Sequence, residues 1–146
     1  MTAGSGDGAV GAFMEALRER DWARLADVLH DELSWTLMSY ELPGPATMDR
    51  ATALRMLPEL LAVFDEGSPR MALGRMIIQG DCMAVECEGS GSFRNGTPYR
   101  NRYAIIFEVV DQRIRTMREY MDTGHMASML GAAQEPAGPA TERRSS

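Results

Sequence analysis

Two stretches near the start of the chain repeat apolar residues every three or four positions, a spacing that places side chains on one face of a helix. The first stretch contains Val10, Phe13, Met14 and Leu17. The second covers residues 22–29 and follows Asp21, whose carboxylate is suited to cap a helix N-terminus. We therefore expect two amphipathic helices at the start of the fold.

A strand, a turn and a third helix are predicted next. Residues 33–39 alternate between apolar and polar side chains, with Leu33, Trp35 and Leu37 on one side, which is typical of a half-buried strand. The sequence Leu42-Pro43-Gly44-Pro45 favours a turn. From residue 49 to residue 64 the spacing is helical again. Pro58 is expected to kink this helix or to start a new one, because proline cannot donate the helical hydrogen bond.

The second half of the chain is strand-like. Its four segments cover residues 70–79, 83–93, 99–110 and 113–121. Turn-forming pairs separate them, and Asn95-Gly96 is the strongest hairpin signal because both residues tolerate a positive φ angle. A short helix is expected at 125–130, ending at Gly131.

Helices followed by long antiparallel strands predict an α+β fold. We expect a cone-shaped α+β barrel in which a curved, mostly antiparallel sheet wraps over the N-terminal helices around a deep apolar pocket. A single domain should cover residues 8–131, because a chain of 146 residues supports one core. Residues 1–7 and 132–146 are rich in small, polar and charged side chains and are expected to be disordered.

The charged residues exclude several classes of function. The chain carries 15 basic residues against 21 acidic ones, and every basic residue is an arginine. Without lysine, Schiff-base catalysis and a phosphate-binding P-loop are excluded. The net charge of −6 argues against binding nucleic acid, which requires a basic face. No signal peptide or membrane span is recognisable, so we expect a cytoplasmic protein with no membrane partner and a small apolar ligand.

Neither a metal nor a cofactor is expected. Cys82 and Cys87 are five residues apart in a strand-like segment, so their side chains point to opposite faces and cannot form a local disulfide. His30 and His125 are the only histidines. No Cys-x-x-Cys or His-x-x-x-His spacing suggests a zinc site.

Strand periodicity places three polar groups on the inward face of residues 99–110. The odd positions of this segment are apolar or aromatic apart from Asn101 and the hydroxyls of Tyr99 and Tyr103. Buried polar groups need hydrogen-bond partners. These groups either contact a substrate or are satisfied by the backbone and by solvent at the rim.

Glu119 shares one face of the last predicted strand with Met117 and Met121. If this face points inward, desolvation raises the pKa of the carboxyl group toward the range of a general acid or base at neutral pH. The alternative is an edge position in which Glu119 pairs with an arginine of the adjacent strand.

Two further candidates have simpler alternatives. Glu86 and Glu88 share a face and form either a carboxylate pair or a solvated outer face matched to Arg100 or Arg102 across the sheet. His125 is either an acid or base at the mouth of the pocket or a capping residue at the start of the terminal helix.

Four motifs together resemble a known family. They are the helix Phe13-Met14-x-x-Leu17, a short second helix ending in Leu29-x-Asp31-x-Leu33-x-Trp35, the strand Tyr99-x-Asn101-x-Tyr103 and the closing Arg118-Glu119-Tyr120-Met121-Asp122-Thr123. Over residues 8–131 the chain resembles the SnoaL-like polyketide cyclase family, within the nuclear-transport-factor-2-like and ketosteroid-isomerase-like superfamily. The resemblance implies a deep hydrophobic pocket and a homodimer packed through the outer sheet face. In cyclases and epoxide hydrolases of this group an acidic residue on the last strand is the general acid or base, and the matching position is Glu119.

We therefore predict a cofactor-independent cyclase of a polyketide or related intermediate in antibiotic or other secondary-metabolite biosynthesis, acting by aldol chemistry or by cycloaddition. The predicted catalytic residues are Glu119, Asn101 and Tyr103. The predicted substrate-binding residues are Trp35, Leu37, Tyr99, Ile105, Met117 and Met121. Two alternatives stay open: an epoxide hydrolase or double-bond isomerase that uses the same acid, and a non-catalytic carrier of apolar small molecules.

Overall fold

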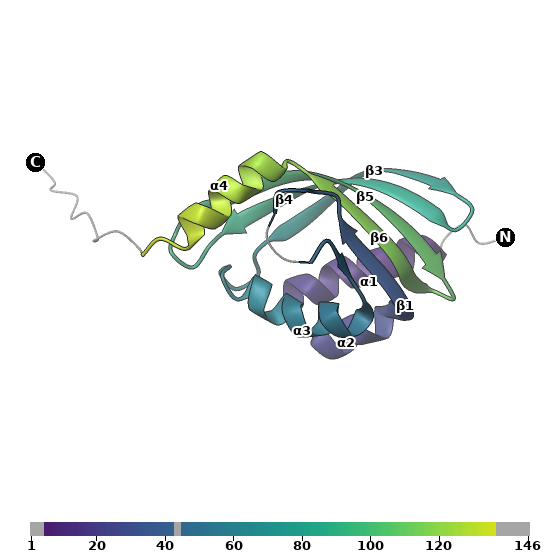
Figure 1. Ribbon diagram of the computed structural model, residues 1–146. Coiled ribbons are helices and arrows are strands. Elements are labelled where there is room, and N and C mark those ends of the chain that lie inside the picture. The colour runs from purple at the N-terminus through teal and green to yellow at the C-terminus, as the bar shows by residue number, and fades with distance from the viewer. Residues whose placement is uncertain (1–4, 43–44, 137–146) are drawn as a thin grey trace, which may run out of the picture.

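The computed structural model describes residues 5–42 and 45–136. Its elements are, in order, α1 (Ser5–Glu19), α2 (Trp22–Val28), β1 (Leu29–Leu37), β2 (Thr47–Met48), α3 (Arg50–Leu61), β3 (Arg70–Gln79), β4 (Cys82–Ser92), β5 (Pro98–Val110), β6 (Arg113–Met121) and α4 (Thr123–Ala133). The sheet arches over α1, α2 and α3, and α4 lies beside one end of the long strands (Figure 1). The predicted disorder of residues 1–4 and 137–146 and the predicted turn at 43–44 lie outside the described residues.

The six strands form one curved sheet in the order β2-β1-β6-β5-β4-β3. β1 runs parallel to β6, and the other neighbouring strands are antiparallel. This confirms the predicted α+β fold with a mostly antiparallel sheet over N-terminal helices. The sheet is open rather than a closed barrel, because β2 and β3 stand at opposite edges and do not pair within the described residues. Helices, not further strands, cover its inner face (Figure 1).

Capping side chains explain where α2 and α3 begin. Asp21 and Asp49 accept hydrogen bonds from backbone N–H groups in the first turns of α2 and α3. α1 begins at Ser5, earlier than the predicted domain start at residue 8. α3 passes through Pro58 and ends at Leu61, so this proline does not start a new helix.

The last helix is longer than predicted, and a side chain from a distant turn bonds to its C-terminal end. α4 follows its N-cap Asp122 and passes through Gly131 instead of ending there. Asn95, in the turn between β4 and β5, donates hydrogen bonds from Nδ2 to the carbonyl oxygens of Ala132 and Glu135 at 2.7 and 3.1 Å. These bonds tie the turn between β4 and β5 to carbonyl groups at and just after the C-terminal end of α4.

The inner face of the sheet carries the core. Along β5 the odd positions are buried and the even ones are mostly exposed, as predicted. Phe13 of α1 packs edge to face against Trp35 and Phe107, with ring centroids 5.6 and 6.1 Å apart. Cys82 is exposed and Cys87 is buried, which confirms the predicted opposite faces. Within the described residues, no helix has the length and apolar content needed to span a membrane.

Candidate active site

A cavity of about 230 Å³ lies between the inner face of the sheet and helices α1, α3 and α4. Its lining is almost wholly apolar, and its side chains with nitrogen or oxygen atoms are Trp35, Tyr99, Tyr103 and Glu119. No arginine or histidine is among its described lining residues. The described part of the chain also contains no group of three His, Cys, Asp or Glu residues placed to hold a metal ion. Within its described lining, the cavity therefore presents one carboxyl group in apolar surroundings without a fixed cation.

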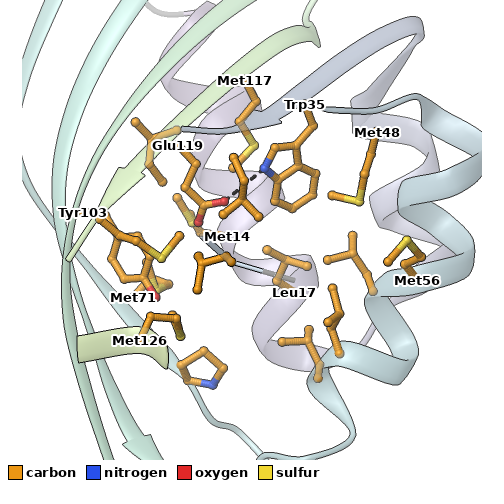
Figure 2. A pocket seen from close by; sticks show the side chains of 18 of the residues that line it. Met14, Leu17, Trp35, Met48, Met56, Met71, Tyr103, Met117, Glu119 and Met126 are labelled. Carbon is orange, nitrogen blue, oxygen red and sulfur yellow. Dashed lines mark hydrogen bonds between the residues drawn. The ribbon is translucent and has the colours of Figure 1, made fainter. Parts of the chain in front are cut away.

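Glu119 extends from β6 into this cavity (Figure 2). β6 lies between β1 and β5, so Glu119 is not at a sheet edge, and its neighbours across the two ladders are Leu37 and Ile105. Its Oε2 accepts a hydrogen bond from Trp35 Nε1 at 3.1 Å. The alternative of an edge position with an arginine partner is wrong, since no ion pair among the described residues includes Glu119.

The surroundings of Glu119 change its acidity. Burial raises the pKa of Glu119 from 4.5 to about 7, and the hydrogen bond from Trp35 opposes this rise. The residue keeps part of its surface exposed, and it borders the cavity. A carboxyl group with a pKa near 7 is present in both protonation states at neutral pH, so it can remove or deliver a proton.

Tyr99 and Tyr103 supply two hydroxyl groups to the cavity wall. Both project from the inward face of β5, and their hydroxyls hydrogen-bond to each other. Figure 2 shows Tyr103 on the side of Glu119 away from Trp35. Burial, together with the negative charge of Glu119, raises the pKa of Tyr99, so this phenol stays protonated and can donate a hydrogen bond.

Gly89 of β4 makes room for the two tyrosine rings. A Cβ atom at this position would lie 3.1 Å from each ring and 3.1 Å from the sulfur of Met71. Only glycine therefore lets the rings and the thioether pack this closely over β4. Sequence analysis missed this residue, because a glycine inside a strand does not reveal which side chains pass over it.

Eight of the nine predicted site residues line the cavity. They are Trp35, Leu37, Tyr99, Tyr103, Ile105, Met117, Glu119 and Met121. Asn101 is the exception: it is 3% exposed but is not among the lining residues. Its Nδ2 donates to the carbonyl oxygen of Asp122 at 3.3 Å, and its Oδ1 accepts from the backbone N–H of Arg102 at 2.8 Å. The amide thus links β5 to the cap of α4, and the structure does not support its predicted catalytic role.

The remaining polar candidates lie outside the cavity. Glu88 forms an ion pair with Arg100 at 2.7 Å, which confirms the interpretation of a charged outer face. The hydrogen bond from Arg100 lowers the pKa of Glu88. His125 is exposed near the start of α4 and borders a separate, more polar hollow. Its backbone N–H donates to the carboxylate of Asp122.

Methionine side chains form much of the cavity wall, as Figure 2 shows for most of them. The seven in the lining are Met14, Met48, Met56, Met71, Met117, Met121 and Met126. The sequence predicts only the pair on β6. The others come from α1, β2, α3, β3 and α4, so no local pattern collects them.

Comparisons with known proteins agree on the family and the fold. A family model described as a SnoaL-like domain matches residues 10–117. No functionally curated protein matches the sequence significantly.

Several solved structures share the fold. TerC co-crystallised with polyporic acid is 21% identical, with a TM-score of 0.73 over 87% of this chain and 98% of that chain. A loop-truncated variant of IdmH is 21% identical, with a TM-score of 0.70 over 86% and 99%. An LEH-like epoxide hydrolase from M. tuberculosis is 22% identical, with a TM-score of 0.67 over 88% and 91%.

At these identities the solved structures establish the fold alone. The family match is stronger evidence, because it extends from α1 to Met117 on β6 and so includes most of the elements around the cavity. It agrees with the resemblance predicted from the motifs. The chain belongs to the SnoaL-like domain family.

Proposed function

We propose that this protein is a cofactor-independent enzyme in which Glu119 transfers protons on an apolar small molecule, and that its reaction is the cyclisation of a polyketide-type chain. The observation that carries the proposal is a carboxyl group, the single one in the described lining, that has a pKa near 7 and projects into an apolar cavity. A catalytic acid or base works best when its pKa lies near the operating pH. Membership of the SnoaL-like domain family supports the same conclusion.

The ring would close by an intramolecular aldol addition. The ionised carboxylate of Glu119 removes a proton from a carbon atom between two carbonyl groups. The resulting enolate carbon attacks a carbonyl carbon further along the same chain and forms the new C–C bond. The alkoxide that results takes the proton back from Glu119, which regenerates the carboxylate.

Tyr99 and Tyr103 would stabilise the enolate. Because their hydroxyls hydrogen-bond to each other, one of the two O–H groups remains to donate to a substrate oxygen. A donor held in place at the site of developing negative charge lowers the barrier more than water does. In this mechanism the tyrosine pair donates a hydrogen bond to the carbonyl oxygen of the substrate, and Glu119 removes the proton from its carbon atom.

The size and charge of the cavity restrict the substrate. About 230 Å³ is below the roughly 300–1,000 Å³ of pockets for drug-sized ligands, which favours a compact or tightly folded chain. Flexible methionine side chains allow the wall to adapt to such a chain. An anionic group would face Glu119 with no lining cation among the described residues, so a neutral substrate is favoured.

Proton transfer can be tested before the natural substrate is known. The protein is incubated in D₂O with a neutral, apolar β-diketone, and deuterium uptake at the carbon between the carbonyls is followed by NMR. We expect Glu119→Gln to reduce the enzymatic exchange by about 10²- to 10⁴-fold. Glu86→Gln is the matched control, because Glu86 is exposed on β4, and it should leave exchange unchanged.

Cyclisation itself is measured with a linear poly-β-ketone thioester and mass spectrometry of the products. Equal exchange and cyclisation rates in wild type and Glu119→Gln would overturn the assignment of Glu119. Near wild-type cyclisation in that variant would favour a cycloaddition promoted by shape alone. Binding without any acceleration by the wild type would favour the non-catalytic carrier.

A double-bond isomerase is the second candidate. The same carboxyl group can remove a proton from one carbon atom and return it to another. The presence of a single carboxyl group in the described lining favours this reaction over epoxide hydrolysis, in which one group activates water while another protonates the epoxide oxygen. Product formed in ¹⁸O-labelled water separates them, because only hydrolysis leaves the label in the product.

We also propose that the protein forms a homodimer through the outer face of its sheet. Ile77 on β3 and Ile106 on β5 are 63% and 37% exposed, and both pair with Ala84 of β4, which forms an apolar row across three strands. Such a row is typical of a surface covered by a partner. Ile106→Arg should convert a dimer to a monomer in analytical ultracentrifugation. A monomeric wild type, or a variant that remains dimeric, would contradict the proposal.

A further inference from the structure

We infer that the cavity is a binding site for apolar molecules that carry one positive charge, such as protonated amines, with the carboxylate of Glu119 as the counter-charge. Like the proposed function, this inference rests on Glu119 facing the cavity. It requires no reaction, so an apolar amine would be a ligand and a competitive inhibitor rather than a substrate.

The first argument is the missing counter-charge. Buried carboxylates in proteins are normally paired with a cation or with several hydrogen-bond donors. Among the described residues, the side chain of Glu119 accepts one hydrogen bond, from the neutral indole of Trp35 to Oε2. Oε1 has no described donor and is left for a ligand in the cavity. The ammonium group of a ligand would supply the cationic partner that the described residues do not provide for Oε1.

The second argument is that the other polar groups around Glu119 carry no positive charge. They are the hydroxyls of Tyr99 and Tyr103 in the cavity wall and the thiol of Cys87 on β4. Burial raises the pKa of Tyr99, and it raises the pKa of Cys87 to about 12. The described residues of the helices that line the cavity contribute only apolar side chains to it. Among the described lining residues, no cationic side chain competes with a ligand cation for the carboxylate.

The third argument concerns desolvation. A buried ion pair is often unfavourable because both charges must leave water. Here folding has already desolvated the carboxylate, as its raised pKa reflects. Only the ammonium group of the ligand must leave water on binding, while its hydrocarbon part gains from contact with the apolar wall. The pocket is thus organised for a cation with an apolar body.

Three ligands of similar size test the charge preference. Cyclohexylmethylamine, cyclohexylmethanol and cyclohexanecarboxylate share one ring and differ in carrying a positive charge, no charge and a negative charge. At pH 8 the amine should bind the wild type at least tenfold more tightly than the alcohol, and the carboxylate should not bind measurably. In Glu119→Gln the amine and the alcohol should bind equally, whereas Glu86→Gln should keep the preference.

The pH dependence is a second readout. The ammonium group binds the ionised form of Glu119, so the affinity for the amine should rise with pH as Glu119 loses its proton near pH 7. Binding at pH 6 should release a proton into the buffer. Calorimetry in two buffers that differ in ionisation enthalpy measures this release. The affinity for the alcohol should not rise with pH in this way.

Equal affinities of the amine and the alcohol for the wild type would overturn the inference, as would an amine preference that persists in Glu119→Gln. If this variant does not fold, the wild type decides: an amine affinity that stays constant from pH 6 to pH 8 refutes the inference. The deuterium-exchange assay separates the two proposals. If deuterium exchange depends on Glu119 but the amine binds no more tightly than the alcohol, the proposed function stands and the inference fails. If the amine binds more tightly but the protein does not accelerate exchange, the inference stands and the proposed function fails.

Discussion

The burial of Glu119 should make the protein less stable as the pH rises through neutrality. The ordinary pKa of this carboxyl group is 4.5, and in the folded protein it is about 7. An acid with a higher pKa in the folded state holds its proton more tightly there. Between the two values the unfolded chain has released its proton while the folded chain still holds it, so the free energy of unfolding falls as the pH rises. At about 1.4 kcal/mol per pKa unit, the loss amounts to roughly 3 kcal/mol.

Glu119→Gln removes this titration with little change in shape. The amide oxygen of glutamine can still accept the hydrogen bond from Trp35, and glutamine cannot ionise. A loss of roughly 3 kcal/mol is a large part of the roughly 5–15 kcal/mol that stabilises a typical domain, so it is measurable. Relative to the wild type, the variant should gain stability steadily from pH 5 to pH 8, and at pH 8 it should be the more stable protein.

Urea denaturation of both proteins at pH 5, 6, 7 and 8 gives the measurement. All other titrating groups are shared, so they cancel in the difference between the two free energies of unfolding. Glu86→Gln, which alters an exposed carboxylate on β4, should run parallel to the wild type. If the curves of Glu119→Gln and the wild type also run parallel, Glu119 titrates at its ordinary pKa and the argument for a desolvated carboxyl group is refuted.

Three further substitutions test other parts of the structure. Trp35→Phe removes the donor to Oε2 of Glu119 and should raise the pKa of this carboxyl further, by about one unit if the bond favours the ionised form by about 1.4 kcal/mol. An alkaline shift in the pH profile of deuterium exchange would show it, and an unshifted profile would contradict it. Leu25→Ala truncates a fully buried side chain and should cost about 2–5 kcal/mol in urea denaturation, with a loss under 1 kcal/mol counting against tight packing. Asp122→Ala removes the N-cap of α4 and should cost about 1 kcal/mol and weaken amine binding, because Met126 of α4 lines the cavity. Unchanged stability and affinity would show that the cap is dispensable.

Strand faces could be predicted from the sequence because their periodicity is a local property. Once Met117 is placed inside, the two-residue repeat also places Glu119 inside, and the structure agrees. Asn101 shows the limit of this argument. Its position in β5 correctly predicts burial, but its amide bonds to the backbone of Asp122, which lies 21 residues further along the chain. A repeat gives the direction of a side chain and not the atoms that it meets.

Helix ends were harder to predict for the same reason. Glycine is common just after the end of a helix, which is why the sequence predicts an end at Gly131. In the structure α4 continues past Gly131, and Asn95 bonds to the carbonyl oxygens of Ala132 and Glu135. That contact joins positions 37 and 40 residues apart in the sequence. The preference of one residue is a local property and carries no information about such a distant contact.

By itself, the sequence determined the α+β class, marked Glu119 as the candidate inward carboxyl group and, through the absence of lysine, excluded Schiff-base catalysis. Only the tertiary structure decided what surrounds that carboxyl group. The parallel pairing of β1 with β6 brings Trp35 to Glu119 across 84 residues of sequence. Side chains from α1, α3, α4 and the sheet close around the same group. A pKa depends on the exclusion of water from every side, so it follows from the packing of the whole fold and not from any local pattern.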